Sequence, residues 1–566
     1  LEIILGNNDL DELLEFDRVF EPKICLVAPY QLKDLSPVTL DILIKHAQDH
    51  PDRWYLLDDS ENFEIGSEIQ SNLLIRLLGQ KQLPPNLIFL FGLIKNTVCP
   101  DFELSFLLNA PREWVDGLEY CVDLTYSRIS SIVQLYYEWL FDELLAFPFV
   151  EAGLSLPEPN AISGLSLSDQ FKKVVADPVF DPKPISLSTP GLIRLDYGEF
   201  ETTVPDVLVK GLIKGFLESR SDSLTDIVQE RVAAYVKETR HATINPQAVV
   251  LGQGVSSLFG ALIQTLRDKL GRSPVVGVPR GSYGPVFPML EYYGARIQLI
   301  ETNPEKAFVL SAEDIQSLKS NPDLLWLTQP GNPSGVFIES EAIRKITRIC
   351  AERGIYIFSD EIFFLLSDST LGSWTPAELS FAYGIKSNDQ HNSHVFFCDG
   401  LAKAFAAGGL RCGFMSCPDS SWADHMRNYL SPVPQAVLRS WDRLYSVFLE
   451  SSPHVLINNA EEFDSVQKYL LEKRAILSDN RARLLLLLQA HGISDGLKYA
   501  RRGGLFVMAR LADRAAALAQ EEALLINPDG WSRADGWSRI CLSVAQSEFE
   551  IAMGRLSSFL TSSGKQ

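Results

Sequence analysis

Residues 400–413 read Gly400-Leu-Ala-Lys403-Ala-Phe-Ala-Ala-Gly408-Gly409-Leu-Arg411-Cys-Gly413. This stretch places one lysine among small and apolar residues, with an arginine eight positions further on. A lysine in apolar surroundings is favoured as a nucleophile or as the amine of a Schiff base, because burial promotes its neutral form. A surface lysine beside a glycine-rich turn would have the same local sequence, so the surrounding motifs decide between the two interpretations.

Three earlier motifs each follow a segment that we predict as a strand. They are Gly252-Gln-Gly254-Val255-Ser256-Ser257, Gln329-Pro-Gly-Asn332-Pro-Ser-Gly335 and Ser359-Asp360-Glu361. The first motif precedes a predicted helix whose N-terminal amides could hold a phosphate, and its spacing does not fit a dinucleotide site. The second motif is typical of a tight turn. The aspartate of the third could cap a helix or face a cationic ring nitrogen.

The segment that contains these motifs alternates strand and helix patterns. Predicted strands cover residues 248–251, 275–278, 324–328 and 355–359. Predicted helices cover residues 256–270 and a segment that begins at a Ser340 cap and ends at Gly354. Short apolar strands separated by helices predict βαβ units and a buried, mostly parallel sheet. The C-terminal part is rich in helix patterns, with a late strand at 540–544, and predicts a smaller α/β domain.

Composition excludes several classes of partner. The chain carries 51 lysines and arginines against 72 aspartates and glutamates, a net charge of −21. We expect no nucleic-acid or membrane partner, because we find no basic patch and no apolar run of the about 20 residues that span a bilayer. The eight cysteines form no CxxC pair. We therefore expect free, buried thiols and a cytoplasmic location. His46 and His50 lack the glutamate of a HExxH motif, so we predict no metal site.

In this order, the four motifs resemble those of the class I/II aminotransferases, which are pyridoxal 5′-phosphate (PLP) enzymes of fold type I. The resemblance covers roughly residues 186–559. It implies an α/β fold with a mostly parallel sheet in a large domain (about 245–420) and a smaller α/β domain (about 191–244 plus 421–566).

The resemblance also implies roles for residues that would hold the cofactor ring. Lys403 would form the Schiff base with PLP and later transfer the proton, and Asp360 would pair with the pyridinium nitrogen. Asn332 would hydrogen-bond the ring 3′-oxygen. Tyr283 matches the aromatic residue that stacks on the ring.

Further roles follow for the phosphate and the substrate. Val255, Ser256 and Arg411 would hold the phosphate, the arginine through a charge-assisted pair. Arg539 matches the arginine that binds the substrate α-carboxylate. Arg533, in a neighbouring copy of the same short motif, is a rival for that role, but only Arg539 leads directly into an apolar strand.

Several positions depart from the family pattern. Phe363 stands where the family has a tyrosine, Gly400 where it has a serine, and Cys412 where an aliphatic residue is usual. A Tyr and Gly expected ahead of the first large-domain strand are missing from residues 219–230. Each lost polar contact costs about 1 kcal/mol of cofactor binding. We expect PLP to bind, whereas efficient turnover is left open.

The first part of the chain predicts a second, degenerate copy of the same fold. Residues 151–190 form a Ser- and Pro-rich linker between this part, 1–150, and the aminotransferase-like module, 191–566. Predicted elements at 23–28, 38–47, 55–57 and 87–91 follow the order strand, helix, strand, strand. A constant difference of 301 in residue number, the offset, aligns Pro29, Ile42, Tyr55 and Asp59 with Pro330, Ile343, Tyr356 and Asp360. An offset of 308 aligns Phe89, Gly92, Leu93, Lys95 and Phe106 with Phe397, Gly400, Leu401, Lys403 and Phe414.

This copy lacks the site. Gln31 replaces the asparagine, and Glu103, which replaces the arginine, would repel a phosphate. We therefore interpret Lys95 as a relic. The helical face of Ile129–Phe147 needs a packing partner, which we expect in the rest of the molecule or in a second chain.

Residues 91–106 and 135–147 resemble the middle region of the plant-type methionine S-methyltransferases. The resemblance implies that the chain is the C-terminal part of such a protein, with a methyltransferase domain preceding it. Three functions remain open: an aminotransferase that acts on an amino acid and a 2-oxo acid as a homo-oligomer, a regulatory or oligomerisation region without turnover, and another fold-type-I enzyme such as a lyase or decarboxylase.

Overall fold

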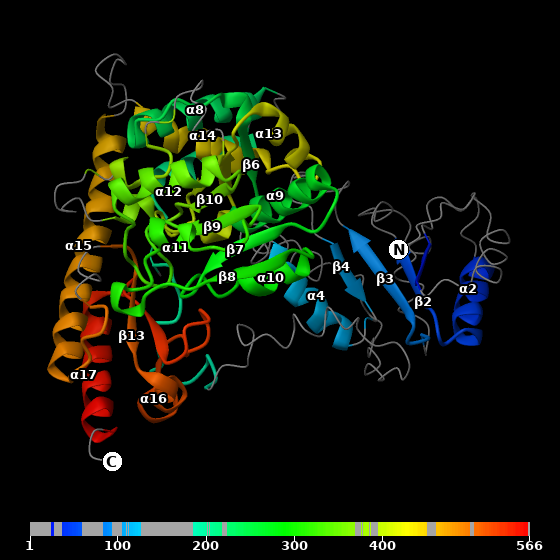
Figure 1. Ribbon diagram of the computed structural model, residues 1–566. Coiled ribbons are helices and arrows are strands. Elements are labelled where there is room, and N and C mark those ends of the chain that lie inside the picture. The colour runs from blue at the N-terminus through cyan, green and yellow to red at the C-terminus, as the bar shows by residue number, and fades with distance from the viewer. Residues whose placement is uncertain are drawn as a thin grey trace. The chain divides into compact units, whose positions relative to one another are not determined.

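A computed structural model describes residues 24–27, 37–58, 83–92, 105–108, 110, 112–125, 185–200, 202, 204–217, 223–367, 375, 377–383, 385, 394–449, 460–497 and 503–563. The chain divides into two compact units (Figure 1). The first comprises Leu1–Asp123 and Ser131–Lys172, and the second comprises Leu124–Ser130 and Lys173–Gln566.

A seven-stranded sheet forms the centre of the second unit, with the strand order β6-β12-β11-β10-β9-β7-β8. Only β12 runs antiparallel to its neighbours, so the other six of these strands share one direction. The prediction of a mostly parallel sheet is confirmed. The strands are β6 (Val249–Gly252), β7 (Val275–Pro279), β8 (Arg296–Ile300), β9 (Leu324–Thr328), β10 (Tyr356–Asp360), β11 (Val395–Gly400) and β12 (Gly413–Ser416).

Helices bury both faces of this sheet. In β9, Trp326 packs into one apolar core, whereas Leu325 and Leu327 pack into another. This alternation explains why the strand is apolar at nearly every position. The first core is completed by α9 (Val255–Leu270), α10 (Val286–Tyr292) and α13 (Ser420–Arg427), and the second by α11 (Ala312–Gln316) and α12 (Ser340–Glu352).

Helix α12 begins one residue earlier than its sequence signal indicates. Its N-cap is Glu339, and Ser340 is the first helical residue and is buried. The prediction of a Ser340 cap is therefore wrong, because the serine is already helical and is buried. Gly354 does follow the helix, with a φ of +66° that favours glycine.

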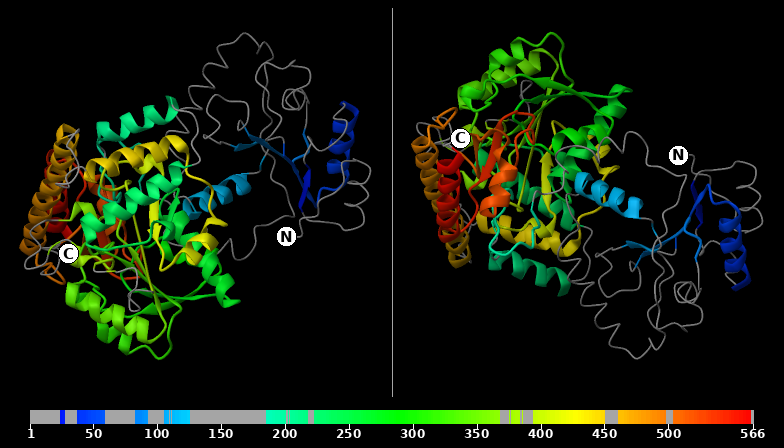
Figure 2. Two further views of the ribbon diagram at one scale, coloured as in Figure 1. Left: turned by 90° about the horizontal axis from the view of Figure 1, so that it is seen from above. Right: turned by 90° about the horizontal axis from the view of Figure 1, so that it is seen from below.

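The rest of the second unit pairs two small sheets with long helices. β13 (Phe506–Arg510) is antiparallel to β15 (Trp537–Cys541), and β5 (Ile193–Arg194) is parallel to β14 (Leu524–Leu525). Figures 1 and 2 show α15 and α17 side by side. The helices are α7 (Asp206–Leu217), α8 (Leu224–Arg240), α14 (Gln435–Leu449), α15 (Ala460–Ala490), α16 (Ala515–Glu522) and α17 (Gln546–Ser563).

Strand β15 corrects the late strand predicted at 540–544. It starts three residues earlier, so that Arg539 lies within the strand instead of before it. The error arises because Ser538 and Arg539 are polar by sequence yet buried in the fold.

The sheet of the first unit repeats the topology of half the larger sheet. Its order is β1-β2-β3-β4, in which the first three strands are parallel and β4 is antiparallel to β3. The sequence β9-β10-β11-β12 has the same directions, and α2 and α12, which follow β1 and β9, are both 13 residues long. The elements are β1 (Ile24–Val27), α2 (Pro37–Asp49), β2 (Trp54–Asp58), β3 (Leu87–Gly92), β4 (Ser105–Leu108) and α4 (Arg112–Thr125).

Strand register supports one of the two predicted offsets. Phe89 pairs with Leu108, as Phe397 pairs with Ser416, which agrees with the offset of 308. Asp58 pairs with Leu90, as Asp360 pairs with Cys398. The structural counterpart of Asp360 is therefore Asp58.

The offset of 301 is wrong in its details. It aligned Asp360 with Asp59, which lies outside the described residues, and Ile343 with Ile42, which is 41% exposed whereas Ile343 is buried. Short differences in loop length shift the alignment from one element to the next, so no single offset holds before β3. Gln31, Lys95, Glu103, the 129–147 run and most of the 151–190 linker also lie outside the described residues.

Close packing of α7 on α14 yields a first prediction. A Cβ on Gly211 would lie 2.6 Å from the Ser440 Cα, whereas a Cβ on the exposed Gly554 of α17 would meet nothing within 4 Å. Gly211→Ala should lower the free energy of unfolding by about 1–3 kcal/mol through overpacking. Gly554→Ala should raise it by about 0.5–1 kcal/mol through helix propensity. Urea denaturation measures both, and equal signs would contradict the packing argument.

Candidate active site

The four sequence motifs meet at one edge of the large sheet. Strands β6, β10 and β11 end at Gly252, Asp360 and Gly400, and Asn332 lies just after β9. The antiparallel β12 starts at this edge with Gly413, two residues after Arg411. Ligands bind at the carboxyl ends of parallel strands, so the predicted residues lie where such a sheet places its chemistry.

An arginine lies at the N-terminus of α9. Gly254 precedes this helix with a φ of +95°, and a Cβ there would overlap the Arg411 guanidinium. Arg411 donates to the Gln253 carbonyl at 3.3 Å and to the Gly408 carbonyl at 3.4 Å. A helix N-terminus and a guanidinium both attract anions. Val255 and Ser256 form the first turn of α9 and are partly exposed beside this arginine.

Asp360 is buried at the end of β10. Its Oδ1 accepts from the Ile362 backbone at 3.1 Å and from the Cys398 thiol at 3.8 Å. Burial, with smaller contributions from Asp399 and Glu361, raises the pKa of Asp360 to about 7. Among the described residues, no lysine or arginine forms an ion pair with this carboxyl.

The two neighbouring carboxylates have a cationic partner. The completely buried Arg240, at the end of α8, contacts Glu361 at 2.9 Å and Asp399 at 2.5 Å. Tyr235 donates to Asp399, and Ser380 donates to Glu361. Sequence reasoning missed Arg240, because nothing in the local pattern of α8 distinguishes it from a surface arginine.

Lys403 is held by an acidic side chain from a distant segment. Its Nζ lies 3.2 Å from Oε2 of Glu199, which also accepts from the Tyr197 hydroxyl at 3.0 Å. Oε1 of Glu199 accepts from the Gly408 amide at 2.8 Å. Tyr197 and Glu199 were not predicted from the sequence. The short Asp-Tyr-Gly-Glu run after β5 was the available signal, but only the fold brings it to the lysine.

Arg539 and Asn332 are brought together. The guanidinium donates to the side-chain oxygens of Asn332 at 3.0 Å and Asn527 at 2.8 Å, and to the Asp196 carbonyl at 2.7 Å. It lies over the rings of Phe506 and Trp531, at 4.5 and 4.2 Å from their centroids. Burial lowers the pKa of Arg539. The side chains that accept hydrogen bonds from Arg539 are neutral amides. The positive charge of Arg539 is therefore available to an anion.

The remaining aromatic residues support this arginine. Tyr283 packs edge-on against Trp531 at 5.6 Å, and Phe363 packs edge-on against Phe506 at 5.2 Å. The phenylalanine that replaces a family tyrosine therefore buttresses a ring that contacts Arg539. The rival Arg533 instead lies over the ring of Phe287, at 5.1 Å.

Steric crowding explains the glycine at position 400. A Cβ at this position would lie 2.7 Å from the Cys412 carbonyl oxygen and 3.1 Å from Cδ1 of Ile362. A serine would displace the backbone next to Arg411. The departure at position 400 is therefore built into the local packing.

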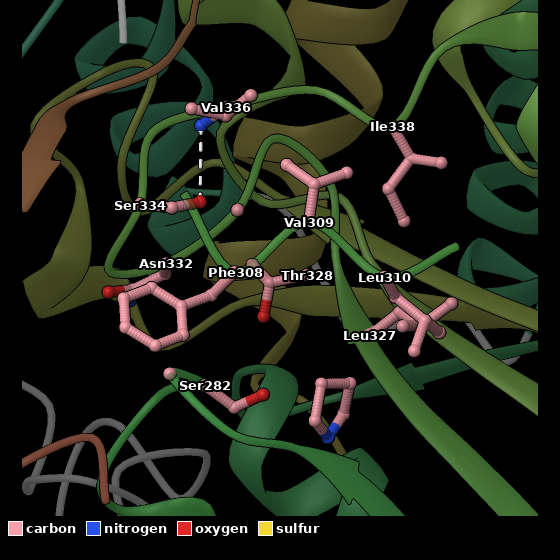
Figure 3. A pocket seen from close by; sticks show the side chains of 13 residues that line it. Ser282, Phe308, Val309, Leu310, Leu327, Thr328, Asn332, Ser334, Val336 and Ile338 are labelled. Carbon is pink, nitrogen blue, oxygen red and sulfur yellow. Dashed lines mark hydrogen bonds between the residues drawn. The ribbon is translucent and has the colours of Figure 1, made fainter. Parts of the chain in front are cut away.

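A small pocket lies beside these residues (Figure 3). Among the residues that line it are Ser282, Phe308, Thr328 and Ser334, together with Asn332 from the predicted set. The Thr328 hydroxyl points into it and has no hydrogen-bond partner among the described residues. Lys403 and Asp360 do not line it. The candidate site therefore consists of the strand-end residues, and the pocket lies outside its centre.

The described residues also bear on the expectations for cysteines, metal sites and membrane spans. Cys350, Cys398, Cys412, Cys417 and Cys541 are free and buried, as predicted, and Cys121 is free and partly exposed. Within the described ranges, no cluster of three or more His, Cys, Asp or Glu side chains could hold a metal ion. No described helix is long and apolar enough to cross a membrane.

The buried carboxyl of Asp360 yields a prediction for the cofactor-free protein. Its pKa is higher in the folded state than its ordinary value of 3.8, so the stability it contributes is lost as pH rises through about 7. Asp360→Asn is neutral throughout. As the pH rises from about 5 to about 8, the wild type should therefore lose about 2–3 kcal/mol of its free energy of unfolding relative to Asp360→Asn. Urea denaturation measures both pH profiles. If the two profiles ran in parallel, the pKa of Asp360 would not be raised in the folded protein.

Comparison with known proteins finds relatives of two kinds. The chain is similar to a methionine S-methyltransferase of Zea mays, 24% identical over 98% of this chain and 52% of the relative. It thus spans about half the length of that relative. It is also similar to a cystathionine beta-lyase of Bacillus subtilis, 25% identical over 53% of this chain and 73% of the relative.

Solved structures show the same fold. The aspartate aminotransferase of Thermus thermophilus with maleate superimposes with a TM-score of 0.56 at 18% identity, over 70% of this chain and 99% of that structure. A family model described as "Aminotransferase class I and II" matches residues 193–556, well over half of the chain. The chain therefore belongs to the class I and II aminotransferases, with the α/β fold of PLP-dependent fold type I.

Proposed function

We propose that this chain is a PLP-dependent enzyme that acts on an amino acid, with Lys403 as the residue that binds the cofactor aldehyde. The observation that carries the proposal is the buried Asp360, whose pKa is raised to about 7 and which has no cationic partner among the described residues. A carboxyl in this condition fits the protonated ring nitrogen of PLP. It ends the strand next to the one that leads to Lys403.

The donor set at the strand ends fits the rest of the cofactor. Arg411 and the first turn of α9, with Val255 and Ser256, would hold the phosphate. Asn332 would bind the ring oxygen, and Tyr283 would lie against the ring. When bound, PLP withdraws electrons from the α-carbon of an amino acid.

The residues of the chain supply the remaining steps. Arg539 would bind the substrate α-carboxylate with its forked donors, helped by Asn332. The rings of Phe506 and Trp531 shield the guanidinium from water, which strengthens this charge pair. The amine of Lys403 would remove and return the proton at the α-carbon.

Transamination between an amino acid and a 2-oxo acid is the reaction we favour, because Arg539 suits a substrate with a free α-carboxylate. A lyase reaction would use the same residues, and the similarity to a cystathionine beta-lyase keeps it as a second candidate. Gly400 and Phe363 favour a third candidate, a non-catalytic region that binds PLP or an amino acid within a methionine S-methyltransferase. A homo-oligomeric state and a cytoplasmic location remain proposals.

Borohydride reduction after addition of PLP tests the assignment of Lys403. Peptide mapping should place the reduced adduct on Lys403, because its amine is the one held at the strand-end site. Lys403→Arg, which keeps the charge but cannot form a Schiff base, should give no adduct there. An adduct on Lys95, or none in the wild type, would refute the proposal.

Substitution of the two competing arginines tests the carboxylate site. Arg539→Lys loses the forked contact and should weaken amino-acid binding by about 10- to 100-fold. Arg533→Lys is the matched control and should change it by less than about threefold. The readout is the change in PLP absorbance during titration with a panel of L-amino acids. If Arg533→Lys had the larger effect, the assignments would have to be exchanged. No response in the wild type would favour the non-catalytic candidate.

A further inference from the structure

The segment between β5 and α7 contacts two of the three cations of the candidate site, Arg539 and Lys403. The Asp196 carbonyl accepts from Arg539, and the Glu199 carboxylate contacts Lys403. Gly198 allows this close approach, since a Cβ there would lie 2.7 Å from the Phe506 ring. One short run of chain is thus fitted against the two residues to which we assign substrate and cofactor binding.

Glu199 is fixed independently of the lysine. The Tyr197 hydroxyl donates to one of its oxygens, and the Gly408 amide donates to the other. Gly408 lies in the same stretch as Lys403, so the carboxylate bridges the segment after β5 and the lysine loop. The Glu199 side chain is only 6% exposed. A carboxylate with two fixed donors keeps its position whether or not a third partner is present.

Lys403 approaches this carboxylate from a less fixed position. Its side chain is 25% exposed, and its Nζ lies 3.2 Å from Glu199 and 5.6 Å from the centre of the Tyr197 ring. Partial burial reduces solvent screening, so the pair is stronger than one at the surface. The chain contains a surface pair for comparison: Lys345 lies 3.1 Å from Glu341, with side chains that are 57% and 67% exposed.

We propose that Glu199 is a positioning residue that holds the Lys403 ammonium in an ion pair in the cofactor-free protein. We call this ion pair the clamp, and it breaks when the amine binds an aldehyde. This inference rests on the proposed function of Lys403. An ammonium has no lone pair for attack on a carbonyl, so the ion pair restrains the reaction of this lysine with any aldehyde. After displacement, Glu199 stays beside the amine because Tyr197 and Gly408 continue to hold it.

Reductive methylation of the cofactor-free protein tests the clamp. Formaldehyde and cyanoborohydride label free amines, and peptide mapping gives the labelling rate of each lysine at about pH 8. Glu199→Gln keeps an oxygen for the Gly408 amide but removes the charge, so the rate at Lys403 should rise by about tenfold. Glu341→Gln is the matched control and should raise the rate at Lys345 by less than about twofold.

A second variant keeps the test decisive if Glu199→Gln folds poorly. Tyr197→Phe keeps both charges but removes the donor that holds Oε2 of Glu199 beside Lys403, so the carboxylate is positioned less firmly and the rate at Lys403 should rise by about threefold. The melting temperature of each variant, and the Lys345 rate within it, show whether the fold is intact. A global loss of structure would raise all lysine rates together, whereas release of the clamp raises that of Lys403 alone.

The outcomes separate this inference from the proposed function. Borohydride trapping of PLP on wild-type Lys403, together with unchanged Lys403 labelling in both variants, would overturn the clamp alone. Failure of the wild type to trap PLP on Lys403 would overturn both. Trapping on Lys403 with a selective rise in its labelling supports both.

Discussion

Both faces of the seven-stranded sheet are buried by helices, and this constraint determines where polar chemistry can occur. Alternate residues of β9 pack into opposite apolar cores, so the body of the sheet has no place for charged groups. Ionisable side chains therefore collect where strands end. Because six strands share one direction and β12 starts where they finish, Asp360 at the end of β10 lies at the same edge as Lys403 and Arg411, which lie between β11 and β12.

Charge balance at this edge distinguishes structural groups from candidate functional ones. Three carboxyls lie close together, and the buried Arg240 satisfies Glu361 and Asp399 but not Asp360. On the other side, Arg539 is hydrogen-bonded by neutral amides, and Lys403 is paired with Glu199. The proposed cofactor and substrate would place a cation beside Asp360 and a carboxylate beside Arg539, and a buried unpaired charge is costly without such a partner.

The first unit repeats this backbone and keeps an aspartate, Asp58, at the position of Asp360, whereas Glu103 aligns with Arg411 at the offset of 308. Its four strands repeat the order, direction and register of β9-β10-β11-β12, and Leu57 and Phe89 are buried as core residues. Apolar packing between strands and helices is sufficient to maintain such a sheet. The site requires a few polar residues in addition, so fold similarity alone does not assign an activity to the first unit.

The sequence by itself determined the fold class, most of the strands and the four motifs, because buried parallel strands and strand-end turns leave local patterns. It also placed Asp360 directly after a predicted strand and singled out Lys403 and Arg411 by their motif. Only the tertiary structure decided their partners. Glu199 reaches Lys403 across 204 residues and Arg240 reaches Glu361 across 121, so no local pattern could indicate either contact. The same holds for Arg539, which sequence placed before a strand. Its contacts with the rings of Phe506 and Trp531 join distant segments, which meet only when the chain folds.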